Sequence, residues 1–233
     1  MRSRKNTIYL TATSIFTVLL LHFFDQGIAL SYINKIGLKI ALFVVVPAVY
    51  TMWTGENVFK TSISNRRARD EKRRHLKSAV ALGTGVFIAI IVTYIFMKQH
   101  IDSSQLVLEF QEKYKINASN ILYYSFYLVF INSFLEEFFF RGFLFLNMKR
   151  LGFRKTAYAF SSLLFTVYHI ANFQNWFSVS IFVFALVGLF VGGCIFNYLD
   201  EKQETFLNSW LVHICADLAI VTIGLYIFGI IKV

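Results

Sequence analysis

Two adjacent glutamates and an arginine lie in an otherwise apolar stretch in the middle of the chain. Glu136 and Glu137 are followed by three phenylalanines and then by Arg141. Ionisable side chains inside a membrane span are costly, so they are rare and usually functional. Glu137 and Arg141 are four residues apart with the acid on the N-terminal side, which is the favoured order for an ion pair along one helix face. Glu136 projects about 100° round the helix from Glu137 and is left to face a cavity.

Two later segments carry imidazoles that can reach the same cavity. The first runs from Phe165 to His169, and the second runs from His213 to Asp217. His213 and Asp217 are four residues apart and therefore project from one helix face. Measured from the cytoplasmic end of its own predicted span, Glu136 lies roughly 16–18 Å deep, His169 roughly 20 Å and His213 roughly 10 Å. We therefore expect these groups to meet in one layer, in the middle or cytoplasmic half of the membrane.

Carboxylates and imidazoles brought together in this way suit hydrolysis. A carboxylate paired with an imidazole can take a proton from water. A second imidazole with a neighbouring donor can stabilise the oxyanion that forms when this water attacks a carbonyl. The same groups can instead bind a divalent metal such as zinc, because two histidines and a carboxylate form a common ligand set. The candidate metal ligands are then Glu136, His169, His213 and Asp217.

Some of these polar residues also have a purely structural interpretation. Glu137 and Arg141 fit an ion pair without a chemical role as well as they fit a functional one. Asn132, Asn172 and Asn197 can hydrogen-bond to the reacting groups, but contacts between helices explain them equally well.

The composition indicates the elements that must position these groups. Of 233 residues, 57% are hydrophobic and 15% are charged, whereas soluble domains carry about 25% charged residues. Apolar runs of about 20 residues recur along the whole chain, which is typical of a polytopic membrane protein. We predict one integral-membrane domain, an all-α transmembrane helical bundle of about seven spans, with six to eight compatible with the pattern. Residues 1–120 would form three helices with a basic cytoplasmic loop, and residues 121–233 would form the part that carries the motifs.

The apolar runs give approximate positions for the spans. Between the third and fourth spans, the polar stretch Lys98–Asn120 is predicted to contain a short surface helix. Gly188 and Gly192 have the Gly-x-x-x-Gly spacing that lets a neighbouring helix approach closely. The predicted spans cover residues 7–24, 38–54, 79–97, 121–148, 156–172, 177–199 and 206–231.

The formal net charge of +10 is explained by membrane topology. Basic residues concentrate in Lys60–Lys77 and in Lys149–Lys155, between apolar runs, as the positive-inside rule requires of cytoplasmic loops. The chain is therefore predicted to be a multi-pass cell-membrane protein with its N-terminus in the cytoplasm and its C-terminus outside. The basic loops can also bind anionic membrane lipid. No nucleic-acid partner is expected, because aromatic residues are not interleaved with the basic run.

Taken in order, the three motifs resemble a known family. The pattern Glu136-Glu137-x-x-x-Arg141, then Phe165-x-x-x-His169, then His213-x-x-x-Asp217 is similar to that of the CPBP family. These are the CAAX-processing and bacteriocin-processing intramembrane endopeptidases, also called the Abi family. The resemblance covers about Ile121 to Ile231. It implies a helical membrane bundle whose cavity opens toward the cytosol.

The resemblance also implies a role for each motif. It implies that Glu136 and His169 activate water, and that His213 and its partner Asp217 stabilise the oxyanion, with Glu137, Arg141 and Phe165 in support. The family often has Asn where this chain has Asp217. An ionised carboxylate would repel an oxyanion, so Asp217 must be protonated, orient His213 or help to bind a metal.

The family has been described both as metalloproteases and as glutamate-dependent proteases, and both alternatives stay open at this stage. The sequence contains neither the His-Glu-x-x-His of zincins nor the Gly-x-Ser-x-Gly of serine-type hydrolases.

These residues predict an intramembrane endopeptidase that cleaves a peptide or a membrane-protein substrate near the cytoplasmic face. Bacterial relatives are linked to bacteriocin maturation or immunity, among other roles. One alternative is a non-catalytic membrane protein that acts as an immunity protein or scaffold. Another is a small proton-coupled transporter, because intramembrane Glu and His also build proton relays. The sequence makes no prediction of oligomeric state.

Overall fold

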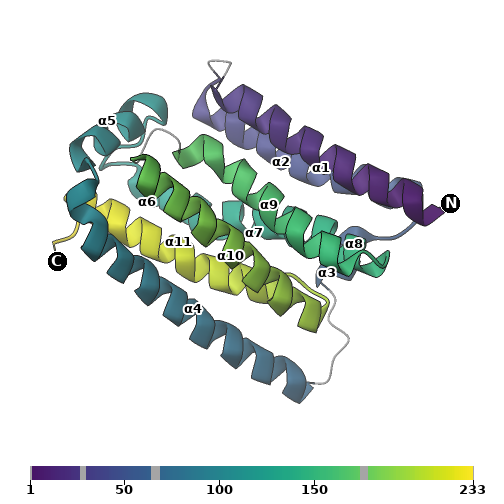
Figure 1. Cartoon of the computed structure of the whole chain (residues 1–233). Helices are drawn as coiled ribbons and strands as arrows, with labels where there is room; N and C mark the ends of the chain where they lie inside the picture. The colour runs from purple at the N-terminus through teal and green to yellow at the C-terminus, as the bar shows by residue number, and fades with distance from the viewer. Residues whose placement is uncertain (1, 27–29, 64–68, 174–177, 233) are drawn as a thin grey trace.

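The computed structural model describes residues 2–26, 30–63, 69–173 and 178–232, and every regular element within these ranges is a helix. The predicted all-α class is therefore confirmed. The two ends of the chain lie at opposite ends of the bundle (Figure 1). This agrees with termini on opposite sides of a membrane, although the orientation itself stays a prediction.

The N-terminal part forms two neighbouring helices and a third that lies apart from them. Helices α1 (Arg2–Gln26) and α2 (Tyr32–Thr54) run side by side (Figure 1). The Ser31 side chain caps the start of α2, and Gly55 ends it with a left-handed φ of 77°, a conformation that glycine adopts without strain. The short helix α3 (Val58–Ile63), which the sequence did not predict, follows, and α4 (Arg69–Met97) then packs along the last helix of the chain.

The polar stretch after α4 contains the short surface helix that the sequence predicted. One turn of 3-10 helix, η1 (Lys98–His100), leads into α5 (Ser103–Lys113). The Asp102 side chain caps α5 by accepting hydrogen bonds from the backbone N–H groups of Ser104 and Gln105. Side-chain capping of this kind defines where a helix begins.

The helix with the paired glutamates forms the centre of the bundle. It comprises α6 (Ile121–Phe126), η2 (Tyr127–Asn132), α7 (Ser133–Glu137), η3 (Phe138–Phe145) and α8 (Leu146–Arg150), with helical backbone throughout. The η2 and η3 segments are π-helical, a local widening that is frequent at functional sites. All eight residues of η3 are buried, including Arg141. A helical segment that is apolar nearly all round belongs in the interior of a bundle, and other helices pack around η3.

The C-terminal part supplies the helices that carry the two histidines. These helices are α9 (Arg154–Phe173), α10 (Val179–Gln203) and α11 (Leu207–Ile227). Helix α10 packs on α9 and α11, while α11 also packs along α4, as the parallel ribbons in Figure 1 show. Both α9 and α11 contact the central helix, so His169 and His213 approach Glu136 and Glu137 from different directions.

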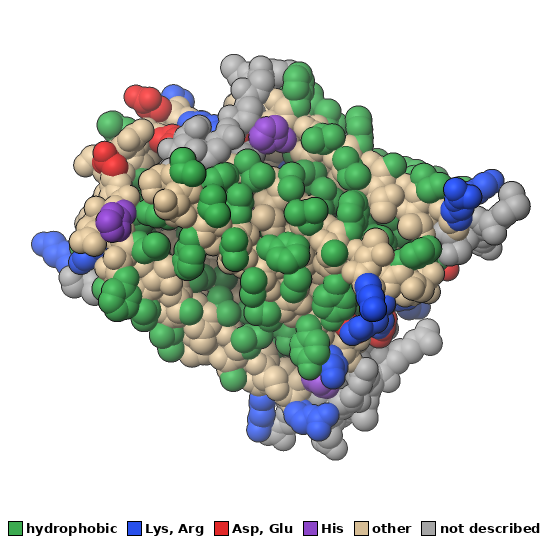
Figure 2. All heavy atoms as spheres, viewed as in Figure 1, with side chains coloured by type: hydrophobic (Ala, Val, Ile, Leu, Met, Phe, Trp, Pro, Cys, Tyr) green, Lys and Arg blue, Asp and Glu red, His purple; other side chains and the backbone are tan. Residues whose placement is uncertain are grey.

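Within the described residues, five helices are long and apolar enough to cross a membrane. In Figure 2, hydrophobic side chains cover the middle of the visible face, while charged side chains lie toward its edges. These findings indicate a membrane-embedded protein. The central helix and α9 are not among the five, so the predicted number of about seven spans stays a prediction. The five candidates are Arg4–Asp25, Tyr32–Thr54, Arg74–His100, Val179–Gln203 and Leu207–Ile227.

In α10, the glycine at the close contact with a neighbouring helix is Gly193, one residue after the predicted Gly192. A side-chain Cβ at Gly188 or Gly192 would have no described atom within 4 Å. A Cβ at Gly193 would instead lie 3.0 Å from the Cβ and 3.1 Å from the Cα of Ser162 on α9. The prediction that Gly188 and Gly192 form the contact was therefore wrong, because the face that α10 turns toward α9 is set by tertiary packing.

This contact gives a testable prediction. Gly193→Leu is expected to destabilise the protein by about 1–3 kcal/mol, because the larger side chain meets the backbone of α9. Gly188→Leu, at an open position on the same helix, is the control and should change stability much less. The measurement is the midpoint of thermal unfolding in detergent. Equal losses from both variants would show that α9 and α10 are not packed as described.

Candidate active site

The carboxyl group of Glu136 lies at the centre of a buried polar cluster. Its Oε1 atom accepts hydrogen bonds from Asn132 Nδ2 at 2.8 Å and from the Tyr168 hydroxyl at 3.0 Å. The ammonium group of Lys39, on α2, lies 3.3 Å from the same oxygen. These contacts hold Oε1 in place from three different helical segments.

The second oxygen of Glu136 faces the two imidazoles. Its Oε2 atom lies 3.6 Å from His169 Nε2 and 3.9 Å from His213 Nε2. Oε2 is buried and has no hydrogen-bond partner among the described residues. Separations of this size between polar atoms are too long for strong direct hydrogen bonds and fit a bridging water molecule.

The ring of His169 is oriented by its own helix. Its Nδ1 atom lies 2.8 Å from the backbone carbonyl of Phe165, one turn earlier in α9. A carbonyl oxygen can only accept, so Nδ1 carries the hydrogen, and in the neutral ring Nε2 is the acceptor. The Phe165 ring packs against His169, with 4.4 Å between ring centroids, and so restricts its rotation.

The ring of His213 is held by the second glutamate. Its Nδ1 atom lies 2.8 Å from Glu137 Oε1, and the same oxygen accepts a hydrogen bond from Arg141 NH1 at 3.1 Å. The side chains of Glu137 and Arg141 are both fully buried. The Arg141 guanidinium lies over the Phe165 ring, 4.0 Å from its centroid, which gives this buried cation a favourable π contact. The predicted ion pair is therefore present, and it also connects the central helix to His213 on α11.

Asp217 completes the cluster on the far side of His213. Its Oδ1 atom lies 3.7 Å from His213 Nε2, and its Oδ2 atom is buried with no partner among the described residues. The His213 ring is thus flanked by carboxylates at both nitrogens. This arrangement favours an imidazolium, in which both nitrogens carry hydrogen, over a neutral ring.

The structure therefore brings together the residues that the sequence singled out. Glu136, His169, His213 and Asp217 converge from the central helix, α9 and α11, with Glu137, Arg141 and Phe165 around them. Asn132 is part of the cluster through its bond to Glu136. Asn197 instead joins α10 to α9 through Ser162 and the backbone of Tyr158. The side chain of Asn172 lies outside the described residues.

The donor set gives no support to the metal-binding alternative. Among the described residues, no group of three or more His, Cys, Asp or Glu side chains has an arrangement that could hold a metal ion. We therefore derive no chemical step through a metal.

Two members of the cluster, Lys39 and Tyr168, were not predicted from the sequence. The predicted span began at Leu38, which put Lys39 at its edge, where lysine is common. The structure starts this helix at Tyr32, so Lys39 lies more than a turn inside it. A lysine inside an apolar helix could have marked Lys39 as a candidate for the cluster. Nothing in the sequence distinguished Tyr168 from the other tyrosines.

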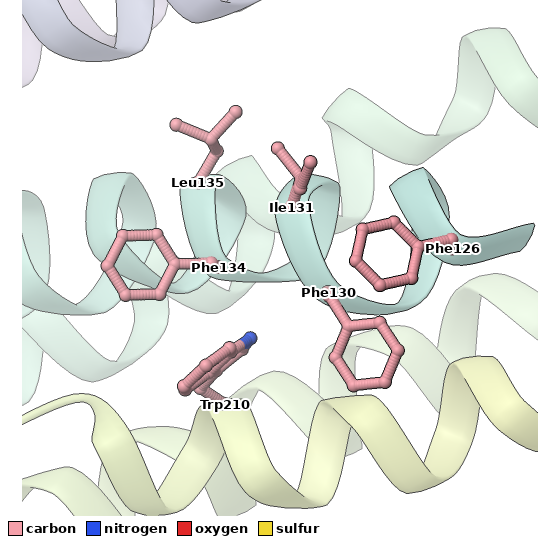
Figure 3. Close-up of a pocket in the computed structure, with 6 residues that line it drawn as sticks. All are labelled: Phe126, Phe130, Ile131, Phe134, Leu135 and Trp210. Carbon is pink, nitrogen blue, oxygen red and sulfur yellow. The ribbon is translucent and has the colours of Figure 1, made fainter. Parts of the chain in front are cut away.

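An apolar pocket lies beside this cluster, between the central helix and α11 (Figure 3). The rings of Phe134 and Trp210 form one wall of it, packed edge to face with 5.1 Å between their centroids. The indole N–H of Trp210 donates to Ser133 Oγ at 3.1 Å, so the wall carries no free donor there. Trp210 is one helical turn from His213, which puts the pocket next to the polar cluster. The lining residues are Phe126, Phe130, Ile131, Phe134, Leu135 and Trp210.

Comparison with known proteins gives a match for the part of the chain that carries the three motifs. Residues 118–219 match the family described as type II CAAX prenyl endopeptidase Rce1-like. All three motifs lie within the matched range, and the match confirms the resemblance to the CAAX protease family. No curated protein and no solved structure matches the chain.

Proposed function

We propose that this protein is an intramembrane endopeptidase, because residues 118–219 match the Rce1-like family of type II CAAX prenyl endopeptidases. It hydrolyses a peptide bond of a peptide or membrane-anchored substrate near the cytoplasmic face, with water activated by Glu136 and His169. One observation carries this proposal. The Oε2 atom of Glu136 lies 3.6 Å from His169 Nε2 and 3.9 Å from His213 Nε2, in a buried site.

In the proposed reaction, water binds between Glu136 Oε2 and His169 Nε2. One water proton passes to this pair, and the oxygen attacks the carbonyl carbon of the scissile peptide bond. The carbonyl oxygen becomes an oxyanion in the tetrahedral intermediate. The intermediate then collapses, the C–N bond breaks, and the proton taken from water passes to the leaving amine. The bond from His169 Nδ1 to the Phe165 carbonyl supports this assignment, because it leaves Nε2 as the proton acceptor.

His213 is the group best placed to stabilise the oxyanion. As an imidazolium its Nε2–H is a donor directed into the cluster, and fixed donors of this kind act strongly in a dry site. Glu137 supports this role, since it accepts the hydrogen at Nδ1 at 2.8 Å. Asp217, which stands where the family often has Asn, then acts as a counter-charge that orients His213.

The substrate is proposed to be an apolar or membrane-anchored polypeptide. The family description refers to prenylated proteins. In this chain, the apolar pocket next to His213 offers space for an apolar segment of a substrate, whether a side chain or a lipid (Figure 3). Such a segment would reach the site from the membrane.

The proposal is tested by finding the peptide whose processing stops. The membrane and secreted peptidomes of cells that express the unaltered protein are compared with those of cells that express Glu136→Ala or His169→Ala. We expect the same cleavage products to be lost in both variants, while each protein remains inserted and folded. Cleavage that survives in both variants would contradict the proposal.

The two alternative functions predict different experimental outcomes. A non-catalytic immunity protein or scaffold would keep its protective or signalling effect in Glu136→Gln, because that role needs no activated water. A proton-coupled transporter would carry solute or ion flux in reconstituted vesicles. No observation on the described residues favours either alternative over hydrolysis.

A further inference from the structure

Lys39 is a lysine of α2 whose charged end points into the bundle. Its Nζ atom lies 3.3 Å from Glu136 Oε1 and 2.5 Å from Asn132 Oδ1. It also lies over the Tyr168 ring, 5.1 Å from the centroid. Lysines near the ends of membrane helices usually extend toward the interface. This one instead has its charged group against a buried carboxylate.

The contacts on Glu136 are divided unequally between its two oxygens. Oε1 receives Lys39, Asn132 and the hydroxyl of Tyr168, whereas Oε2 has no hydrogen-bond partner among the described residues. A carboxylate held in this way cannot turn without losing three donors. Its remaining lone pairs are thereby directed toward His169 and His213.

The charges around Glu136 also indicate a role for Lys39. Glu136 lies near Glu137 and Asp217 in a nearly dry site, where a further negative charge is costly. Lys39 is the only lysine or arginine paired directly with Glu136 among the described residues, since Arg141 is paired with Glu137. Without Lys39, the cluster would hold three carboxylates with Arg141 and the two imidazoles as the only balancing groups.

We propose that Lys39 is a positioning residue for the reaction, which compensates the charge of Glu136 and orients Oε2 toward the bound water. This inference rests on the proposed function, because it assigns a role within that hydrolysis. It names a residue outside the matched family segment, on a helix that carries none of the three motifs. The N-terminal helices then contribute to the chemistry as well as to the scaffold.

The first test measures the pairing without any substrate. Lys39→Met, Glu136→Gln and the double variant are purified, and their thermal unfolding midpoints are compared in a double-mutant cycle. Lys39→Met is expected to lower the midpoint, because it leaves a buried carboxylate uncompensated. The double variant should recover part of that loss, because it no longer contains the uncompensated charge. Strictly additive shifts would overturn the proposal.

Lys35→Met is the matched control for this substitution. Lys35 lies one turn earlier on α2, and the side chains of both lysines are 18% exposed. Its partner Asp25 is also bonded to Lys113, so removing Lys35 leaves no carboxylate unpaired. We expect a small shift that is independent of Glu136→Gln.

The second test measures catalysis with two probes, a farnesylated peptide ending in a CAAX sequence and the peptide identified by the peptidome comparison. Lys39→Met is expected to lower kcat by about 10–100-fold while KM changes less than about threefold, because the bound water, not the substrate, is misplaced. Lys39→Arg keeps the charge and should recover most of the lost rate, and Lys35→Met should cleave like the unaltered protein. An unchanged kcat in Lys39→Met, or the same loss in Lys39→Arg and Lys39→Met, would overturn the proposal.

The two tests separate the failure of this inference from the failure of the proposed function. If the unaltered protein cleaves neither probe and no peptide changes in the cells, the protease function fails. The unfolding cycle then still decides whether Lys39 and Glu136 are coupled. If cleavage depends on Glu136 but not on Lys39, the protease stands and the positioning role is rejected.

Discussion

Purified Glu136→Gln is expected to cleave its peptide substrate about 10²–10⁴-fold more slowly than the unaltered protein, the contribution typical of a general base. The substitution keeps the shape of the side chain but removes the charge that faces the bound water. Because Gln and Glu are nearly isosteric, the loss should appear in kcat, with little change in KM. Steady-state kinetics in detergent or lipid discs measure both constants.

Glu112→Gln is the control for this experiment. Glu112 is exposed on α5, outside the polar cluster, so this variant loses one carboxylate without a change in the site. It should retain the activity of the unaltered protein. The role of Glu136 as the base would be rejected if Glu136→Gln kept more than about a tenth of kcat, since that loss is smaller than a general base contributes.

The second large effect is expected in stability. Arg141→Met should lower the free energy of unfolding by about 3–5 kcal/mol, because it breaks a fully buried ion pair and leaves Glu137 with His213 as its remaining partner. Neither the Glu137 nor the Arg141 side chain has measurable exposure to solvent. Chemical or thermal unfolding in detergent measures the free energy of unfolding of the variant and of the unaltered protein.

A surface pair provides the comparison. Arg154 binds Glu201 through two hydrogen bonds, but the Arg154 side chain is 60% exposed. Arg154→Met should therefore cost less than about 1 kcal/mol. The double variant Arg141→Met/Glu137→Gln should be more stable than Arg141→Met alone, because the buried negative charge that lost its arginine is then also removed. If Arg141→Met cost no more than Arg154→Met, the buried network from Arg141 to His213 would not exist as described.

The sequence by itself determined the helical class and the positions of most helices. Runs of apolar residues are intrinsic to the chain, and a span needs nothing from distant residues to be recognised. The pairing of Glu137 with Arg141 was equally local, because a separation of four residues brings two side chains together on any α-helix. The three motifs also indicated the family, since types and spacing of residues are properties of the sequence alone.

Only the tertiary structure decided how the motifs meet and what each atom contacts. It brought His213 to Glu137, where the sequence suggested Arg141 alone, and it divided the contacts of Glu136 between two oxygens. It also moved the close helix contact from Gly188 and Gly192 to Gly193, and it brought Lys39 in from a helix without a motif. The physical reason is the same in each case. Periodicity gives the face on which a side chain projects, but which partner occupies that face depends on how separate helices pack.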